Sequence, residues 1–383
     1  MYNNITSQII ANGKLTEKVQ IERSVRQGCP LSMILFVLTT IPLINMIEEN
    51  PDIKGIRTKY KNEIKILAYA DDTTICISDS KSIPKTIEIY NKHAAASESK
   101  LNNDKTEILK LGKWKTKMPM EENYKNWIKE EINVLGGRFS SNKVKTGKIN
   151  WELKIEKIRK LIQSFETRNL SMVGKVLLAN TILLSQIWHI AAILPMEEKY
   201  ILKINRMINI WINGKNGEYI IDLLAKKREN GGLGLINLEN RIKTIKIKSL
   251  QFLITGKWTK EHEILIYWAG THTFTLGNKN IIGPRCENGT NDYCKTMKLM
   301  VKHKEKLREI DKMKLKDIEK EIYRTEQYKP EYANIYSGKY TKFISINFKI
   351  ATGILKTATK MDLRNRACIF CKERAENIYH LFF

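Results

Sequence analysis

The chain has 383 residues, of which 66 are Lys or Arg and 41 are Asp or Glu, so its formal net charge is +25. This length predicts two to three domains, and 42% hydrophobic residues exclude a disordered tail protein. The charge favours a polyanionic partner, most often nucleic acid, and the alternative is a merely basic soluble protein. The chain has six cysteines at wide spacings, which exclude a disulfide framework. We therefore expect a reducing compartment and predict an intracellular protein of the nucleus or the cytoplasm.

Two uncharged apolar stretches, 27–47 and 176–196, are long enough to cross a membrane. The first contains Pro30 and Pro42, and the second is interrupted by polar residues such as Asn180. Because these interruptions are typical of core helices, we predict that both stretches are buried and that the protein has no membrane partner.

The first 140 residues alternate between strand and helix patterns. The expected strands are 17–23, a strand–turn–strand hairpin over 64–78, 106–111 and 132–139. The expected helices are a buried one that begins near Leu31 and a second over 82–99. This pattern predicts an α+β unit.

From about residue 150 onward, apolar residues recur in steps of three and four, which is typical of helices. The expected helices begin at Trp151 and then cover 170–194, 200–212 and 238–253. Residues 295–329 alternate basic and acidic side chains, which indicates a solvated helix face. The fold class predicted for the whole chain is therefore α+β, with a mainly helical second part.

The sharpest chemical feature is Tyr69-Ala70-Asp71-Asp72, at the turn of the predicted hairpin. Two carboxylates between buried strands would lose hydration and repel each other unless a cation lay between them, and Mg²⁺ suits their oxygens. Paired metal ions stabilise the attacking 3′-hydroxyl oxygen and the leaving pyrophosphate in a polymerase. Adjacent side chains diverge along a strand, so we expect Asp71 to bind metal directly and Asp72 to contribute less. The alternative is that both residues merely favour the turn backbone.

Several ordered motifs resemble one family. They are Arg26-Gln27-Gly28-Cys29-Pro30-Leu31-Ser32, Ala68 to Asp72, Leu101-Asn102 with Lys105-Thr106-Glu107, Val134-Leu135-Gly136-Gly137, Leu170-Ser171 with Gly174-Lys175, Gly231-Gly232-Leu233-Gly234-Leu235, and Cys368-Ile369-Phe370-Cys371 with His380. With these motifs in this order, the chain is similar to the reverse transcriptase of non-LTR (LINE-type) retrotransposons. The resemblance covers most of residues 17–383 and is loose over 255–345.

The resemblance implies an RNA-directed DNA polymerase that uses an RNA template, a DNA primer or target, and deoxynucleotides. Asp71 and Asp72 would hold Mg²⁺ or Mn²⁺. Lys105 would protonate or steady the leaving pyrophosphate, and its alternative is a plain turn lysine. The implied nucleotide and template pocket consists of Arg26, Gln27, Gly28, Tyr69 and Ala70.

The resemblance also implies four parts. They are a partial palm over 1–145, a helical thumb-like region over 146–255, a basic charged linker over 256–345, and a truncated Cys/His zinc-knuckle-like segment over 346–383. Cys368, Cys371 and His380 offer three Zn²⁺ ligands, whereas a closed structural site has four. The sequence leaves two interpretations of this segment open, an incomplete zinc site and a turn that binds no metal.

Members of the family place another metal-binding Asp well before the Arg-Gln-Gly segment. The only acidic residues before Arg26 are Glu17 and Glu22, and neither lies at the corresponding place. We therefore expect a fragment truncated at both ends, with an incomplete metal site and little activity. The alternatives are a non-catalytic nucleic-acid-binding remnant and a relic without a stable fold, and no oligomeric state is indicated.

Overall fold

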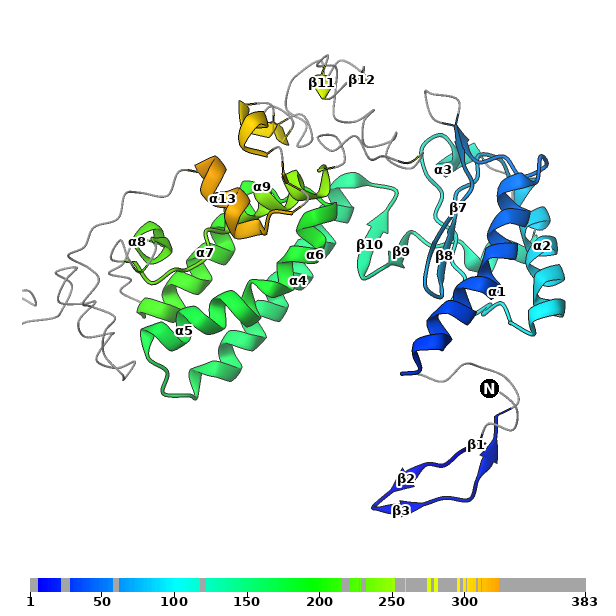
Figure 1. The fold of residues 1–383 in the computed structure, drawn as a ribbon, viewed down its shortest axis with the longest axis horizontal. Coiled ribbons are helices and arrows are strands. Elements are labelled where there is room, and N and C mark those ends of the chain that lie inside the picture. Colours follow the sequence, from blue (N-terminus) through cyan, green and yellow to red (C-terminus); the bar gives the residue numbers. More distant parts are fainter. Residues whose placement is uncertain are drawn as a thin grey trace, which may run out of the picture. The chain divides into compact units, whose positions relative to one another are not determined.

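The computed structural model describes most of the chain up to residue 251 and parts of residues 259–323. The described residues are 6–21, 28–57, 62–117, 122–214, 221–226, 228, 232–251, 259, 274–276, 279–281, 295–296, 299–300, 302–307, 309–310 and 312–323. They belong to two compact units (Figure 1), the first mainly Met1–Ser141 and the second mainly from Asn142 onward. Helices combine with short antiparallel strand pairs, so the predicted α+β class is confirmed.

The first unit begins with a nested hairpin of short exposed strands. Its strands are β1 (Thr6–Ser7), β2 (Ile10–Ala11), β3 (Lys14–Leu15) and β4 (Val19–Gln20). Strand β1 pairs with β4, and β2 pairs with β3 around Asn12-Gly13, where both residues have positive φ. This is the backbone that a tight two-residue hairpin requires. Of the strand predicted over 17–23, the described residues 17–21 form only β4.

Two helices and a hairpin form the core of the first unit. The elements are α1 (Pro30–Glu49), β5 (Ile56–Arg57), β6 (Glu63–Ile64), β7 (Ile66–Tyr69), β8 (Asp72–Ile75) and α2 (Ser82–Ser97). Leu43 and Ile47 of α1 pack with Ile66 of β7 and Ile89 of α2, and each of these residues is at most 6% exposed. Burying one such side chain stabilises the fold by about 1.5–3 kcal/mol. The predicted hairpin and the predicted helix 82–99 are both confirmed.

The prediction that α1 is a buried helix is wrong for its first half. In that half only Ser32 is buried, and α2 and β7, the described elements packed against α1, cover mainly its last turns around Leu43 and Ile47. Large side chains left exposed are Met33, Ile34, Phe36, Val37, Leu38 and Ile41.

Two helices of the described part are long and apolar enough to span a membrane, judged by length and composition alone. They are α1, with 17% of its most apolar window buried, and the helical run Met172–Ile193, with 39% buried. Core helices of soluble proteins meet the same criteria. The absence of a membrane partner stays a prediction.

The first unit ends in a further hairpin where one strand was expected. It follows the short helices α3 (Trp114–Lys117) and η1 (Glu122–Trp127) and consists of β9 (Glu131–Val134) and β10 (Gly137–Ser140). Its turn residues Leu135 and Gly136 have φ of 48° and 77°. Gly136 adopts the positive φ of this turn without strain, so the prediction of one strand over 132–139 is wrong. The strand expected at 106–111 is reduced to a single bridge between Ile108 and Ile128.

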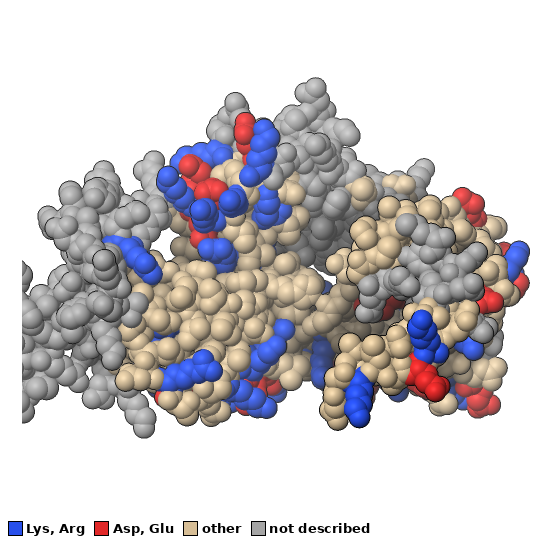
Figure 2. Space-filling model, turned by 60° about the horizontal axis from the view of Figure 1, so that its bottom comes forward, with Lys and Arg blue, Asp and Glu red and all other residues tan. Residues whose placement is uncertain are grey.

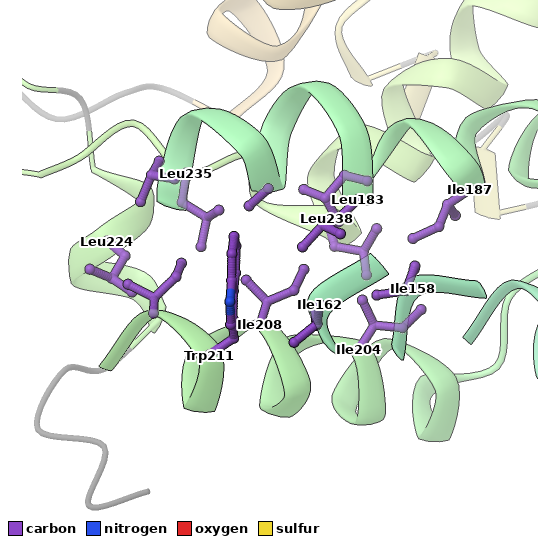
Figure 3. Close-up of a cluster of buried hydrophobic side chains, with 14 of the residues drawn as sticks. Ile158, Ile162, Leu183, Ile187, Ile204, Ile208, Trp211, Leu224, Leu235 and Leu238 are labelled. Carbon is purple, nitrogen blue, oxygen red and sulfur yellow. The ribbon is translucent and has the colours of Figure 1, made fainter. Parts of the chain in front are cut away.

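The second unit is a helical bundle, as its periodicity predicts. Its helices are α4 (Lys143–Glu166), α5 (Met172–Leu178), the π-helical turn η2 (Ala179–Leu183), α6 (Ser185–Ile193), α7 (Glu198–Asn213), α8 (Ile221–Ala225) and α9 (Leu238–Ser249). In Figure 3, Ile158 and Ile162 of α4 lie with Ile204 and Ile208 of α7 in one buried cluster. The helical run Met172–Ile193 contributes Leu183 and Ile187 to the same cluster, so its prediction as a core helix is confirmed.

The last described elements of the second unit are short. They are β11 (Phe274–Leu276), β12 (Lys279–Ile281), η4 (Lys304–Leu307) and α13 (Leu315–Tyr323). Helix α13 packs on α9 and buries Ile318 and Ile322, while Glu319 forms an ion pair with Arg241 of α9. The charged stretch predicted as a solvated face therefore contains an amphipathic helix with one buried side.

Candidate active site

The Tyr69-Ala70-Asp71-Asp72 segment forms the tip of the β7–β8 hairpin. Tyr69 pairs with Asp72, which leaves Ala70 and Asp71 as a two-residue turn. Ala70 has a φ of 51°, in the left-handed region that costs a residue with a Cβ about 1–2 kcal/mol. The backbone at the tip is thus held in a strained form, which is typical of functional turns.

The tip lies in solvent, whereas the base of the hairpin lies in the core. Tyr69 is 70% exposed, and Ala70, Asp71 and Asp72 are also exposed, while Ile66 is 5% exposed. The prediction that two desolvated carboxylates lie between buried strands is therefore wrong. Water screens the repulsion between Asp71 and Asp72, so the fold needs no cation at the tip.

The donor set at the tip fits a hard divalent cation. Carboxylate oxygens are the ligands that Mg²⁺ prefers, and two of them project from one tight turn. Among the described residues, no group of three or more His, Cys, Asp or Glu side chains could hold a metal ion. Asp71 and Asp72 would therefore supply only part of a six-oxygen shell, with water, substrate or groups outside the described residues supplying the rest.

A buried lysine fixes the base of the hairpin. Lys65, 6% exposed, donates from Nζ to the carbonyl oxygens of Glu48 at 3.0 Å and Asn50 at 2.6 Å. These carbonyls lie at the end of α1, where a cation also stabilises the helix dipole. The Lys65 carbonyl accepts from the Cys76 amide at 2.7 Å, so the same residue extends the hairpin pairing.

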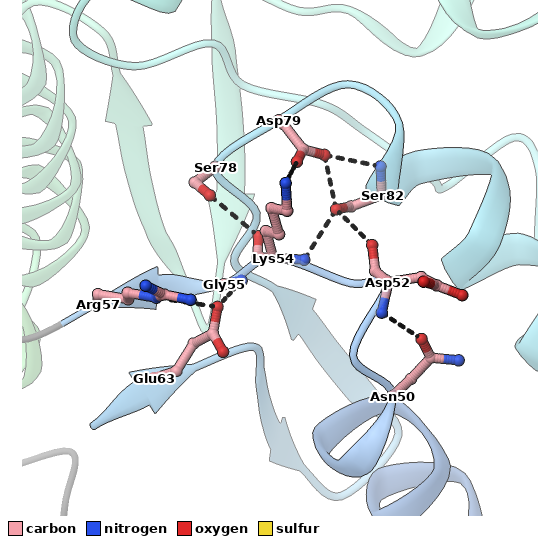
Figure 4. Close-up of polar contacts among 9 residues, drawn as sticks. All are labelled: Asn50, Asp52, Lys54, Gly55, Arg57, Glu63, Ser78, Asp79 and Ser82. Carbon is pink, nitrogen blue, oxygen red and sulfur yellow. Dashed lines mark hydrogen bonds and ion pairs between the residues drawn. The ribbon is translucent and has the colours of Figure 1, made fainter. Parts of the chain in front are cut away.

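The segment that leaves the hairpin is held by a polar network (Figure 4). Asp79 accepts from the Ser82 amide at 2.9 Å and from its hydroxyl at 2.7 Å, at the start of α2. Ser82 Oγ accepts in turn from the Lys54 amide at 2.9 Å. Burial alone would raise the pKa of Asp79, but the Ser82 hydrogen bonds and the charges of Lys54 and Lys81 outweigh it and lower that pKa.

A second part of the network fixes the strands beside the hairpin. Glu63 accepts from the Gly55 amide at 2.7 Å and faces Arg57 at 3.9 Å, while Asn50 accepts from the Asp52 amide at 2.8 Å (Figure 4). A Cβ on Gly55 would lie 2.4 Å from the Ile64 carbonyl oxygen, so this close approach requires glycine.

The remaining predicted site residues are less closely linked to the tip. Gly28 has a φ of 86° and precedes Cys29, the N-cap residue of α1, while Arg26 and Gln27 lie outside the described residues. The Lys105 amide donates to the Asn102 carbonyl at 3.2 Å and to its side chain at 3.1 Å. This agrees with a turn lysine, and none of the described contacts joins Lys105 to the hairpin.

The proposed zinc ligands Cys368, Cys371 and His380 also lie outside the described residues. The zinc site therefore stays a prediction, as do the nucleotide contacts assigned to Tyr69 and Ala70.

The charged side chains are dispersed on the face that Figure 2 shows. Figure 2 shows the Lys and Arg side chains of one face in separate groups, several of them with Asp or Glu nearby. Such a distribution favours diffuse, salt-sensitive attraction of polyanions over one basic groove.

The sequence analysis missed several residues that hold the framework. Lys65 interrupts an apolar run between Ile64 and Ile66, and this interruption is the signal that marks it. Asn180 stands in an apolar helix, which is the same kind of signal. A third residue that the sequence analysis missed is Lys246 in α9, where burial lowers the pKa of the ammonium group to about 8.

The Gly231–Leu235 motif has a structural role in its described part. Asn180 Nδ2 donates to the Gly234 carbonyl, and Asn180 Oδ1 accepts from the Ile236 amide, each at 2.9 Å. A Cβ on Gly232 would lie 2.0 Å from the Lys226 carbonyl oxygen, and Gly234 has a φ of 72°. The glycines thus allow the segment to pack closely against α8 and η2.

Parts of the chain are similar to known proteins. Residues 1–139 match the family described as reverse transcriptase (RNA-dependent DNA polymerase). Over 257 residues, 66% of this chain, the sequence is 27% identical to the Transposon TX1 uncharacterized 149 kDa protein of Xenopus laevis. The match spans 19% of that protein's length. The predicted resemblance to a retrotransposon reverse transcriptase is confirmed, and it rests on the family match over residues 1–139 and on the similarity to this transposon protein.

Proposed function

We propose that the chain acts in RNA-directed DNA synthesis in a non-LTR retrotransposon. One observation carries this proposal: the strained, exposed β7–β8 turn presents Asp71 and Asp72 within the residues that match the reverse transcriptase family. The reaction joins a deoxynucleotide to the 3′-hydroxyl of a DNA primer or target, copies an RNA template and releases pyrophosphate.

The described residues have separable roles in this reaction. Asp71 and Asp72 would hold Mg²⁺, which when bound supplies the positive charge that stabilises the attacking and leaving oxygens. The positive φ of Ala70 sets the tight turn that presents both carboxylates to solvent. The exposed ring of Tyr69, next to the turn, offers an apolar face to the nucleotide.

The core contacts explain how an exposed turn keeps its position. Ile66 anchors β7 between α1 and α2, and Lys65 fixes the same strand to the end of α1. A site fixed on rigid elements loses less entropy when substrate binds.

Primer extension tests the proposal. The purified chain is given an oligo(dT)-primed RNA template, deoxynucleotides and increasing Mg²⁺, beside Asp71→Asn and the control Asp104→Asn, which removes an exposed turn carboxylate. We expect weak extension that rises with Mg²⁺, because two carboxylates hold the ion loosely. Asp71→Asn should abolish extension and Asp104→Asn should retain it.

The second candidate function is nucleic-acid binding without catalysis, which the net charge of +25 favours. It predicts template binding without extension at any Mg²⁺ concentration. Binding would then be unchanged in Asp71→Asn and would fall steeply with salt. That outcome would contradict catalysis by this chain.

A further inference from the structure

The second unit contains a groove that includes Leu170 and Lys175 of the motifs above and that the proposed function does not use. It lies where α4 ends, α5 begins and α7 ends, and its volume is about 760 Å³. Pockets for small-molecule ligands and cofactors measure roughly 300–1,000 Å³. All of its lining residues belong to the second unit. We refer to this cavity as the α4–α7 groove.

Cations outnumber anions along the groove. Arg159, Arg168 and Lys175 line it together with one acidic residue, Glu166. Arg159 also pairs with Glu156, one turn earlier in α4. The Arg168 side chain is exposed, and its guanidinium group lies 5.5 Å from the centre of the Phe165 ring. Two arginines with exposed side chains can therefore reach a ligand in the groove.

Lys175 is held in place by the end of α7. Its Nζ donates to the Trp211 carbonyl at 2.7 Å and lies 5.8 Å from the centre of the Trp211 ring. Burial lowers the pKa of Lys175, and the charge of Glu166 opposes that change. This contact fixes one cation at the side of the groove.

Buried aromatic rings lie beneath the charged residues. The Phe165 and Trp211 rings, 9% and 6% exposed, have centroids 6.2 Å apart. Ile162, Met207 and Ile210 add apolar surface. Because both rings are largely buried, the exposed apolar surface of the α4–α7 groove comes from Ile210, which is 40% exposed and lines the groove together with the exposed arginines.

This combination fits a phosphate attached to a flat, weakly polar group. Guanidinium groups bind phosphate oxygens in pairs, and apolar or aromatic surfaces accept the face of a base. A duplex keeps its bases stacked inside, so only its phosphates could reach the rim. We propose that the α4–α7 groove binds a nucleotide and its phosphodiester from single-stranded nucleic acid. The proposal concerns a different unit from the Asp71–Asp72 turn and does not depend on polymerase activity.

Binding of a fluorescently labelled single-stranded oligonucleotide without Mg²⁺ tests the proposal. The full chain is compared with the double variant Arg159→Gln/Arg168→Gln and with the control Lys203→Gln/Arg206→Gln. The control removes the same charge from exposed side chains of α7 that do not line the groove. We expect affinity to fall about tenfold or more in the groove variant and about twofold or less in the control.

Photocrosslinking locates the ligand directly. An oligonucleotide that contains 4-thiouridine should crosslink to peptides containing Phe165 or Trp211, and Asp71→Asn should leave the crosslink unchanged. Circular dichroism shows whether both double variants keep the fold. Equal losses of affinity in the two variants would overturn the proposal in favour of diffuse charge.

Competition distinguishes the sources of phosphate. An unlabelled single strand should displace the probe well below the concentration required of a duplex or of inorganic phosphate at matched ionic strength. Displacement by inorganic phosphate as effective as by the strand would overturn the proposal, because the groove would then recognise only an anion. Crosslinks confined to peptides outside 159–211 would also overturn it.

Discussion

The side chain of Asn180 binds the backbone of the glycine segment at Gly234, with a donor-to-carbonyl distance of 2.9 Å. A second bond from the Ile236 amide to Asn180 Oδ1, also 2.9 Å, completes a two-bond bridge. Asn180 lies in η2, where the helical pattern widens to a π-helical turn. Such turns often mark positions with a special side-chain role, and here the role is to hold the segment before α9.

Replacement of this side chain should destabilise the second unit. Asn180→Leu keeps the size but leaves the Gly234 carbonyl and the Ile236 amide without their partner, at a cost of about 2–4 kcal/mol. Thr181→Ala, at the exposed neighbouring position, should change the free energy of unfolding by no more than about 1 kcal/mol. Urea unfolding followed by circular dichroism measures both. Equal effects would mean that the bridge contributes nothing specific.

Lys65→Met should destabilise the first unit by about 2–3 kcal/mol. The substitution removes the donor of the Glu48 and Asn50 carbonyls at the end of α1. Lys92→Met changes the same residue type at an exposed position of α2 and should be nearly neutral. Urea unfolding of both variants tests this, and a stable Lys65→Met protein would contradict the assigned role.

Glycine at position 70 should stabilise the hairpin, whereas glycine in a helix should not. Ala70→Gly removes left-handed strain of about 1–2 kcal/mol and adds an unfolded-state entropy cost of about 0.4–1 kcal/mol, so the net gain is about 0–1.6 kcal/mol. Ala95→Gly in α2 should lose about 0.5–1 kcal/mol. Opposite signs in thermal unfolding confirm the strain at the tip, and equal losses would refute it.

Acid should weaken the first unit through Asp79. Because the folded-state pKa is lowered, the contribution of this carboxylate is fully present above its unfolded pKa of about 4. It is lost as pH falls through the lower folded value. Asp79→Asn should therefore reduce the loss of unfolding free energy on acidification, whereas Asp104→Asn should not. An unchanged pH profile in Asp79→Asn would exclude this linkage.

Local sequence signals predict the helices and strands better than they predict which other elements cover them. The β7–β8 hairpin follows from alternating Ile residues around a short turn, and α4 follows from its apolar steps of three and four. The exposure of the Asp71–Asp72 turn could not be predicted, because it depends on which elements cover the strands. The same is true of α1, whose apolar composition resembles that of a core helix although Met33 is 74% exposed.

The sequence pattern also does not predict hydrogen bonds between side chains and backbone groups that are far apart in the sequence. Asn180 and Gly234 are 54 positions apart, and Lys175 reaches a carbonyl 36 positions away. Periodicity reports which face of a helix is apolar, but it does not report which carbonyl a polar residue on that helix will meet. The role assigned to Lys105 stays a prediction, since its described contacts are local backbone contacts with Asn102.

The position of Lys65 has a consequence for local motion. Its carbonyl oxygen accepts a hydrogen bond within the hairpin, and its ammonium group donates to the carbonyls at the end of α1. Opening of either the hairpin or the helix end therefore breaks a hydrogen bond that holds the other. Amide hydrogens of β8 and of the last turn of α1 should therefore exchange with solvent in one concerted opening event. The carboxylate turn is exposed, yet it should move as a rigid extension of a slowly exchanging core.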